Sequence, residues 1–201
     1  MVKKALHIIL ISFLLLLLLF TTLVPSETPV HVHARQLRCH DDERRTLLEL
    51  KGSLGSDSPC FESWKMEREA GNCCSWTGVV CGGPSSHVVG LDLGLCEKLN
   101  DPIPPEIGRL VHLQELSLSE SHLEGPIPPS VSNLTELVYL DLSFNYFHGP
   151  ILPLLSNLTR LEELFLVENQ FTGDIPLSMV NLTRLTRLHL STNQFTGEIP
   201  S

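Results

Sequence analysis

The amino-acid sequence predicts an α/β repeat protein, a right-handed solenoid with a parallel β-sheet on its concave face and a disulfide-bonded N-terminal cap. Two observations support this fold class. Residues at seven positions recur every 24 residues in the C-terminal half, and all six cysteines lie between Cys39 and Cys96. The chain also starts with an apolar segment. We therefore expect a signal peptide in residues 1–34, the cap in residues 35–86 and the repeats in residues 87–201.

The N-terminus has the layout of a secretory signal peptide. Lys3 and Lys4 precede a nearly continuous apolar run over residues 8–20, which matches the basic and apolar regions of such signals. Small residues favour cleavage after Ala34, and cleavage after Ser26 is the alternative. An uncleaved signal anchor is a second alternative, because the apolar stretch is barely long enough to span a bilayer. The segment predicts a secreted protein of the apoplast or cell wall, or a cell-surface protein if the full-length form carries a transmembrane helix.

Charge excludes several kinds of partner. The 201 residues contain 23 Asp and Glu against 14 Lys and Arg, a net charge of −9. Removing residues 1–34 takes away Lys3, Lys4 and Glu27, which leaves 12 basic and 22 acidic residues and a net charge of −10. Such acidity argues against nucleic acid and against anionic membrane surfaces. We expect a membrane contact only through an anchor in a missing C-terminal segment.

The cysteines predict disulfides. An even number of cysteines confined to one stretch of an exported chain is typical of a disulfide framework. A metal site would need paired C-x-x-C spacing or a Cys/His set, and neither occurs, so we expect no bound metal. The adjacent Cys73 and Cys74 point in opposite directions if extended, which assigns them to different bridges. Spacing alone leaves the pairing open.

A short amphipathic helix is expected between the first two cysteines. Acidic residues 41–43 lie where a helix N-terminus favours negative charge. Leu47, Leu50 and Leu54 then follow at spacings that place them on one helical face.

The repeats follow the template L-x-x-L-x-L-x-x-N-x-[LF]-x-G-x-I-P, the pattern of a leucine-rich repeat. Four units stay in register, and an earlier unit begins at Leu91 with one extra residue. The L-x-L core predicts a short strand whose leucines point inward, so that successive strands stack in parallel. Asn145, Asn169 and Asn193 are expected to hydrogen-bond the backbone of the neighbouring coil. Glycine permits positive φ at the next corner.

The cap and repeat motifs resemble those of plant leucine-rich repeat proteins. The resemblance is carried by CCSWTGVVC at residues 73–81, by CHDDERRTLLELK at residues 39–51 and by the G-x-I-P repeat ending. This family includes receptor-like kinases, receptor-like proteins and polygalacturonase-inhibiting proteins. The resemblance implies the disulfides Cys39–Cys73 and Cys74–Cys81. Cys60 and Cys96 lie outside that pattern, and either form a third bridge or leave Cys96 as a buried free thiol.

The outward residues of the repeats form the candidate binding surface, because the inward positions are filled by leucine. Exposed aromatics are typical interface anchors, although these could simply pack on neighbouring strands. The acids favour a neutral or basic protein or peptide ligand, with a co-receptor as a further partner, unless they form only a solvated surface. The candidate residues are Glu115, Ser117, Glu120, Tyr139, Asp141, Phe144, Tyr146, Glu163, Phe165, Glu168, Arg187 and His189.

Three N-x-T glycosylation sequons begin at Asn133, Asn157 and Asn181. They share one repeat position, so any glycans would form a row away from the strands. Alternatively, these asparagines serve only the turn.

Neither a catalytic motif nor a cofactor-binding motif is present, so we expect neither enzyme activity nor a cofactor. The histidines at 112, 122, 148 and 189 occupy variable positions where solvated side chains are expected. The favoured function is extracellular protein or peptide recognition in a plant receptor-like protein, in defence or developmental signalling. The alternative is a soluble inhibitor of a pathogen cell-wall enzyme. Because the sequence stops inside a repeat, we expect a truncated product or a partial gene model.

Overall fold

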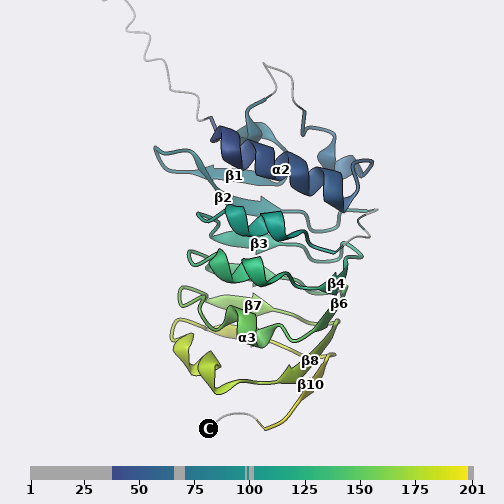
Figure 1. Cartoon of the computed structure of the whole chain (residues 1–201), viewed down its shortest axis with the longest axis vertical. Helices are drawn as coiled ribbons and strands as arrows, with labels where there is room; N and C mark the ends of the chain where they lie inside the picture. Colours follow the sequence, from purple (N-terminus) through teal and green to yellow (C-terminus); the bar gives the residue numbers. More distant parts are fainter. Residues whose placement is uncertain (1–37, 66–70, 98, 100–101, 199–201) are drawn as a thin grey trace, which may run out of the picture. The chain divides into compact units, whose positions relative to one another are not determined.

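The computed structural model describes residues 38–65, 71–97, 99 and 102–198. These belong to one compact unit that begins at Leu37. The predicted signal peptide lies outside the described residues. So do both candidate cleavage sites, after Ala34 and after Ser26. Within the unit, consecutive coils stack one on the next beneath the cap helix (Figure 1). The predicted solenoid with a parallel sheet and a disulfide-bonded cap is confirmed.

Two sheets run along the stack. The first has the order β1-β2-β3-β5-β7-β9 and the second the order β10-β8-β6-β4. Every pairing is parallel except that of β1 with β2. The strands are β1 (Val79–Gly82), β2 (His87–Asp92), β3 (Glu115–Ser117), β4 (Glu124–Pro126), β5 (Tyr139–Asp141), β6 (Tyr146–Gly149), β7 (Glu163–Phe165), β8 (Gln170–Asp174), β9 (Arg187–His189) and β10 (Gln194–Thr196).

Strand β2 connects the cap to the repeats. It pairs antiparallel with β1 and parallel with β3, so one sheet is continuous between the two parts. We propose that the cap ends at residue 86 and the repeats begin at residue 87. The strand that starts there, β2, is where antiparallel pairing gives way to parallel pairing.

Short helical turns complete the coils. They are η3 (Pro105–Arg109), η4 (Pro129–Asn133), α3 (Leu152–Leu155) and η5 (Leu177–Asn181). Only α3 is α-helical, and it occurs in the unit where Leu152 replaces the usual proline. Without a proline after it, Ile151 adopts a helical conformation with φ −91° and ψ −41°, which a following proline would disfavour.

The core is a set of columns rather than a single centre. Leu110, Leu134 and Leu158 are fully buried, and the next residue in that column, Leu182, is 4% exposed. The aromatic column stacks in the same way: ring centroids lie 6.1 Å apart for Phe147–Phe171 and 6.4 Å apart for the next pair. Each coil therefore buries its apolar side chains against its neighbours, which is the energetic basis of a solenoid.

The cap is built around the expected helix, α2 (Asp41–Leu54). Leu47 and Leu50 are fully buried and Leu54 is 2% exposed, as the spacing predicts. Trp64 and Trp76 stack with ring centroids 5.3 Å apart. Two single turns, η1 (Pro59–Phe61) and η2 (Cys73–Ser75), complete this layer.

Three disulfides tie the cap together. Cys39–Cys73 and Cys74–Cys81 are the pairs that the family resemblance implies. Of the two alternatives for the remaining cysteines, the structure has the bridge, Cys60–Cys96. Because Cys96 follows β2, this bond links the cap directly to the first repeat.

A polar ladder closes the bend after each strand. Nδ2 of Asn169 donates to the carbonyl of Leu142 at 2.8 Å, and Nδ2 of Asn193 donates to that of Leu166 at 2.7 Å. These bonds to the preceding coil confirm the predicted role. In one of the two units without asparagine, the hydroxyl of Ser121 donates to the carbonyl of Leu93 at 2.6 Å.

Candidate ligand-binding surface

The outward side chains of four consecutive strands form two columns. Parallel pairing in constant register aligns them from coil to coil, and the leucine between them on each strand points into the core. The first column is Glu115, Tyr139, Glu163 and Arg187, and the second is Ser117, Asp141, Phe165 and His189. We call these eight residues the strand face. They lie on the strands on which the sequence placed them.

Aromatic rings cross the strand face from β5 to β9. The ring centroids of Tyr139 and Phe165 are 5.7 Å apart, and those of Phe165 and His189 are 4.9 Å apart. Tyr139 and Phe165 remain half-buried and His189 is exposed. The rings pack on their neighbours and still present a continuous aromatic strip to solvent.

Tyr139 lies among acidic groups. Its hydroxyl donates to Oδ2 of Asp141 at 3.3 Å. Burial, and then the charge and hydrogen bond of Asp141, raise the pKa of Tyr139 to about 12, with smaller contributions from Glu163 and Asp92. The phenol therefore stays protonated at neutral pH and can donate a hydrogen bond.

Small pockets lie on both sides of Tyr139. One, of about 170 Å³, is formed with Gly90, Asp92 and Glu115. The other, of about 280 Å³, is formed with Glu162 and Glu163. Each is open, lined by a carboxylate and bordered by the phenol ring, so the surface offers acidic recesses beside an aromatic strip.

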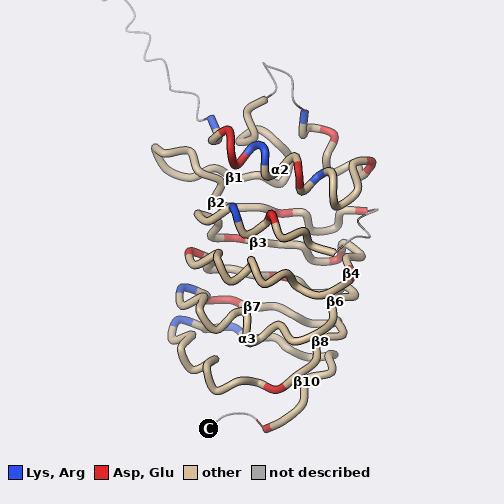
Figure 2. The backbone as a smooth tube through the Cα atoms, viewed as in Figure 1, with Lys and Arg blue, Asp and Glu red and all other residues tan. Residues whose placement is uncertain are grey.

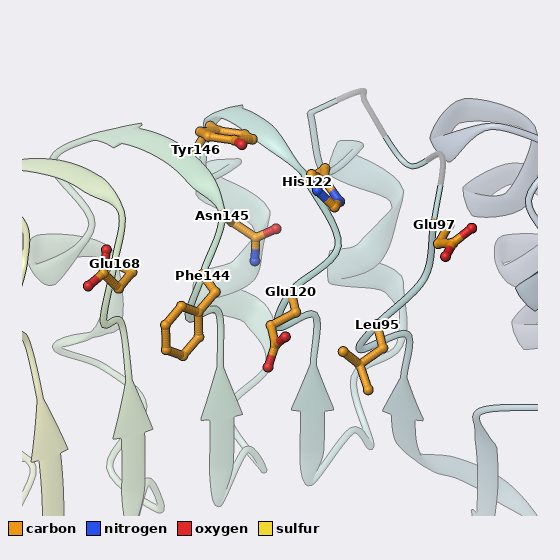
Figure 3. Close-up of a pocket in the computed structure, with 8 residues that line it drawn as sticks. All are labelled: Leu95, Glu97, Glu120, His122, Phe144, Asn145, Tyr146 and Glu168. Atoms are coloured by element: carbon orange, nitrogen blue, oxygen red, sulfur yellow. The ribbon is translucent and has the colours of Figure 1, made fainter.

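Four of the twelve candidate residues lie outside the strands of the first sheet. Tyr146 is not on the concave strands, because it begins β6 in the second sheet. Glu120, Phe144 and Glu168 lie beyond the ends of β3, β5 and β7, at positive φ. Figure 3 shows them in a row past the strand tips, with Tyr146 on a returning strand. The positive φ takes these side chains out of the alternation that the strand pattern assumes.

Sequence reasoning also missed two residues of these surfaces. Asp92 on β2 pairs in register with Ser117 and therefore extends the second column. Leu95 lies at positive φ beyond β2 and lines the same pocket as Phe144. Aligning Leu91 with Leu116 would have found both, since that alignment continues the register of the repeats by one unit.

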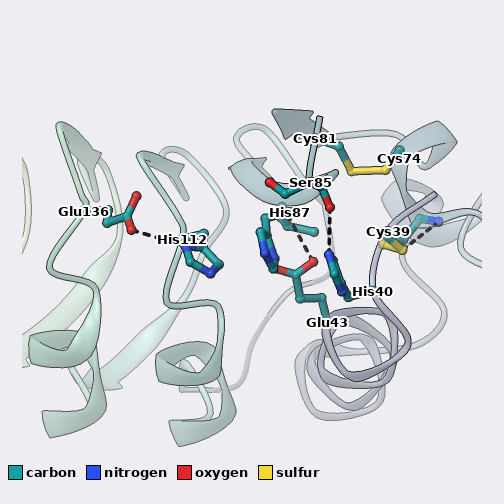
Figure 4. A network of polar contacts seen from close by, with 11 residues as sticks. Cys39, His40, Glu43, Cys74, Cys81, Ser85, His87, His112 and Glu136 are labelled. Atoms are coloured by element: carbon teal, nitrogen blue, oxygen red, sulfur yellow. Dashed lines mark hydrogen bonds and ion pairs between the residues drawn. A yellow bond between two sulfur atoms is a disulfide. The ribbon is translucent and has the colours of Figure 1, made fainter. Parts of the chain in front are cut away.

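His112, for which the sequence predicts a solvated side chain, instead contacts Glu136 and His87. Its Nδ1 lies 3.2 Å from Oε1 of Glu136, and its ring centroid lies 3.9 Å from that of His87. His87 in turn stacks on His40, with centroids 4.1 Å apart, and its Nδ1 lies 3.1 Å from Oε1 of Glu43. Figure 4 shows this row of imidazoles from the start of α2 to the repeats. It contributes to the attachment of the cap.

No group of three or more His, Cys, Asp or Glu in the described ranges could hold a metal ion. The sequon residues Asn133, Asn157 and Asn181 are all exposed, at or just after the helical turns. Among the described helices, none is long and apolar enough to cross a membrane.

The charge along the stack is uneven. Residues 110–159 contain five acids and no lysine or arginine. Figure 2 shows the basic residues mainly on the cap and around β7 and β9, with acidic residues recurring between them. Of these five acids, Glu136 is paired with Arg160 at 3.6 Å, whereas Glu115 and Asp141 have no ion pair among the described residues. The coils that carry Glu115, Tyr139 and Asp141 are therefore acidic on their strands, which disfavours an anionic ligand.

Comparison with known proteins agrees with this architecture. A model described as a leucine-rich repeat region matches residues 92–199, more than half of the chain, and a leucine-rich repeat N-terminal domain matches residues 40–82. The chain belongs to the leucine-rich repeat family.

Plant receptor-like proteins are among the similar sequences. Receptor-like protein 7 of Arabidopsis thaliana is 34% identical over 141 residues, which cover 57% of this chain and 14% of that protein. Receptor-like protein 30 of the same species is 41% identical over 93 residues, or 43% of this chain and 11% of that protein. The chain thus spans a small fraction of the length of these relatives.

Solved structures of plant leucine-rich repeat ectodomains have the same fold. The BIR2 ectodomain of Arabidopsis thaliana has a TM-score of 0.73 at 35% identity, covering 80% of this chain and 84% of that one. PEPR1, solved with AtPEP1, has a TM-score of 0.73 at 36% identity, covering 80% of this chain and 22% of that one. This leucine-rich repeat chain is accordingly an extracellular or cell-surface domain, a setting in which its three disulfides persist.

Proposed function

We propose that this chain is the N-terminal part of a plant receptor-like protein and that its strand face binds a peptide or protein ligand in defence or developmental signalling. One observation carries the proposal most directly. The Tyr139–Phe165–His189 strip is open to solvent and is flanked by Glu115, Asp141 and two acidic recesses. Aromatic strips of this kind supply apolar contact area at low entropic cost.

The chemistry of the face favours a neutral or basic peptide. Asp141 and Glu115 make no ion pair within the described part of the chain, whereas Glu163 is paired with Arg187 at 2.9 Å. A ligand that offers a basic side chain near β3 and β5 would therefore gain charge complementarity there. Similar proteins support a peptide: PEPR1 was solved with AtPEP1, and GASSHO1/SCHENGEN3, 38% identical, with CASPARIAN STRIP INTEGRITY FACTOR 2.

A peptide-display experiment tests this assignment. A phage-displayed random peptide library is selected on the immobilised full chain and on a Tyr139→Ala/Phe165→Ala variant of equal melting temperature. We expect selected peptides to bind the wild-type chain at least about tenfold more tightly than the variant. Leu177→Ala, which removes a 68% exposed apolar side chain of η5 outside both sheets, is the matched control. Equal binding to the double variant would place the ligand elsewhere.

The inhibitor alternative predicts a different outcome. The full chain would slow hydrolysis of polygalacturonate by a pathogen polygalacturonase, and Tyr139→Ala/Phe165→Ala would leave that inhibition unchanged if the strand face is not used. Such inhibition would replace the receptor assignment.

A further inference from the structure

A second exposed surface lies just beyond the strand face. Leu95, Glu120, Phe144 and Glu168 occupy equivalent positions in four successive coils, and Tyr146 stands above them on β6. We call these five residues the ledge. They line an open pocket of about 560 Å³ together with Glu97, His122 and Asn145. Figure 3 shows the four residues of successive coils in a row past the tips of the strands.

The backbone of the ledge is held firmly. The amide of Glu120 donates to the carbonyl of Ser143 at 3.0 Å, and that of Phe144 donates to the carbonyl of Val167 at 2.8 Å. Each coil is thus hydrogen-bonded to the next at this row. A ligand would meet a preorganised platform, which lowers the conformational cost of binding.

The side chains of the ledge contribute little to the stability of the fold. All four residues of the row have φ between 52° and 60°, a region that favours glycine and asparagine and costs other residues about 1 kcal/mol. Leu95 and Phe144 are nevertheless 71% and 53% exposed, and Tyr146 is 51% exposed. Large apolar side chains at such positions gain little from burial within the chain, so an intermolecular contact accounts for them better.

The acids of the ledge are unpaired. Glu120 and Glu168 make no ion pair with any residue in the described ranges. Glu120 and Phe144 also lie within residues 110–159, which contain no lysine or arginine. The ledge therefore presents free carboxylates between exposed apolar side chains.

This pattern specifies the partner. Along the row the order is apolar, acidic, apolar, acidic, and the next coil carries Thr192 at the same position, with about 4.8 Å between neighbouring coils. We propose that the ledge docks a segment of a partner protein that runs across the coils and presents apolar and basic side chains in turn on the face that meets the ledge. Leucine or aromatic side chains would contact Leu95, Phe144 and Tyr146, while arginine or lysine would pair with Glu120 and Glu168.

This docking is independent of the proposed ligand site. The strand face points outward from β3, β5 and β7, whereas the ledge begins only after those strands end and includes a residue of the second sheet. The chain would thereby hold a ligand on one surface and a basic partner segment on the other.

Peptide binding to the full chain tests the ledge. The probe is a labelled synthetic peptide of repeated Leu-Ser-Arg-Ser, in which leucine and arginine alternate on one face of the extended chain. Its affinity is measured by fluorescence anisotropy. Two matched peptides carry glutamate in place of arginine or serine in place of leucine. We expect binding of the first peptide only, with an affinity that falls as salt increases.

Variants then locate the binding site. Glu120→Gln/Glu168→Gln removes the charges, and Leu95→Asn/Phe144→Asn removes the apolar groups while suiting positive φ, so both should fold. Each should weaken binding about tenfold. The control Asp42→Asn/Glu62→Gln removes two exposed acids of the cap, outside both surfaces, and should change affinity less than about twofold. Equal losses in ledge and control variants, binding of the glutamate or serine peptide, or no binding by the wild-type chain would overturn the proposal.

Discussion

Nδ2 of Asn145 donates to the carbonyl oxygen of Leu118, 27 residues earlier, at 2.7 Å. The same amide also donates to the carbonyls of Leu142 and Ser143 within its own coil. Its Oδ1 accepts from the amides of Ser121 and Leu123. One buried side chain thus satisfies five backbone groups at a bend that has no strand pairing, and it connects two coils.

Replacing Asn145 with alanine should destabilise the chain strongly, because it leaves buried backbone groups without partners. We expect a loss of about 2–4 kcal/mol in the free energy of unfolding, measured by urea denaturation. Asn193→Ala is the control: this asparagine makes the same kind of bonds but is half-buried, so water can replace them and the loss should be smaller. Equal losses would contradict this account.

Removing the Cys60–Cys96 disulfide should cost more than removing Cys74–Cys81. The first closes a separation of 36 residues and the second one of 7. Loop-closure entropy then predicts losses of about 4 and about 2.5 kcal/mol, respectively. Paired Cys→Ser variants compared by thermal denaturation measure the difference. The opposite order would mean that strain or residual structure in the unfolded chain dominates.

Two glycine substitutions should have opposite effects. A Cβ at Gly108 would lie 2.4 Å from the carbonyl oxygen of Ser130 in the next coil, whereas nothing lies within 4 Å of one at Gly52 in α2. Gly108→Ala should therefore destabilise the stack by about 1–3 kcal/mol. Gly52→Ala should stabilise the helix by up to about 1 kcal/mol. Urea denaturation of both variants gives the two signs directly.

The ionisation of Tyr139 should be visible in an alkaline titration. The chain has two tyrosines, and ultraviolet absorbance should show a component with a pKa of about 12 that Tyr139→Phe abolishes. Asp141→Asn should lower this pKa because it removes both the charge and the hydrogen bond, and Glu163→Gln should lower it less.

The raised pKa of Tyr139 also predicts how the stability of the fold changes with pH. Because the pKa of Tyr139 is raised on folding from 10.0 to about 12, its contribution is fully present below pH 10 and is lost as the pH rises toward 12. Tyr139→Phe should therefore flatten the loss of stability in that window. An unchanged pH profile would show that the phenol is not shielded as described.

At least one of the sequons should carry a glycan when the chain is expressed in a secreting plant cell. Asn133, Asn157 and Asn181 are exposed and followed by Leu-Thr, so an oligosaccharide meets no buried surface there. Peptide N-glycosidase treatment followed by mass spectrometry of Asn→Gln variants would identify the occupied sites. An unmodified mass for the wild-type chain would leave these asparagines with a role only in the turn.

The repeat period by itself determined the coils, the strands and the inward leucines. These features depend on spacing within one unit, and Leu116, Leu140 and Leu164 pair in the register that a 24-residue shift requires. It also placed Glu115, Tyr139 and Phe165 outward, since side chains alternate along a strand.

Only the tertiary structure decided what surrounds the strand ends and how the cap is attached. The positive φ of Phe144 and the start of β6 at Tyr146 end the alternation, and so they separate the ledge from the strand face. The stacking of His40 on His87 and the Cys60–Cys96 bond join residues 47 and 36 positions apart. Such contacts depend on where distant segments meet in space, and a pattern that repeats within 24 residues carries no information about that.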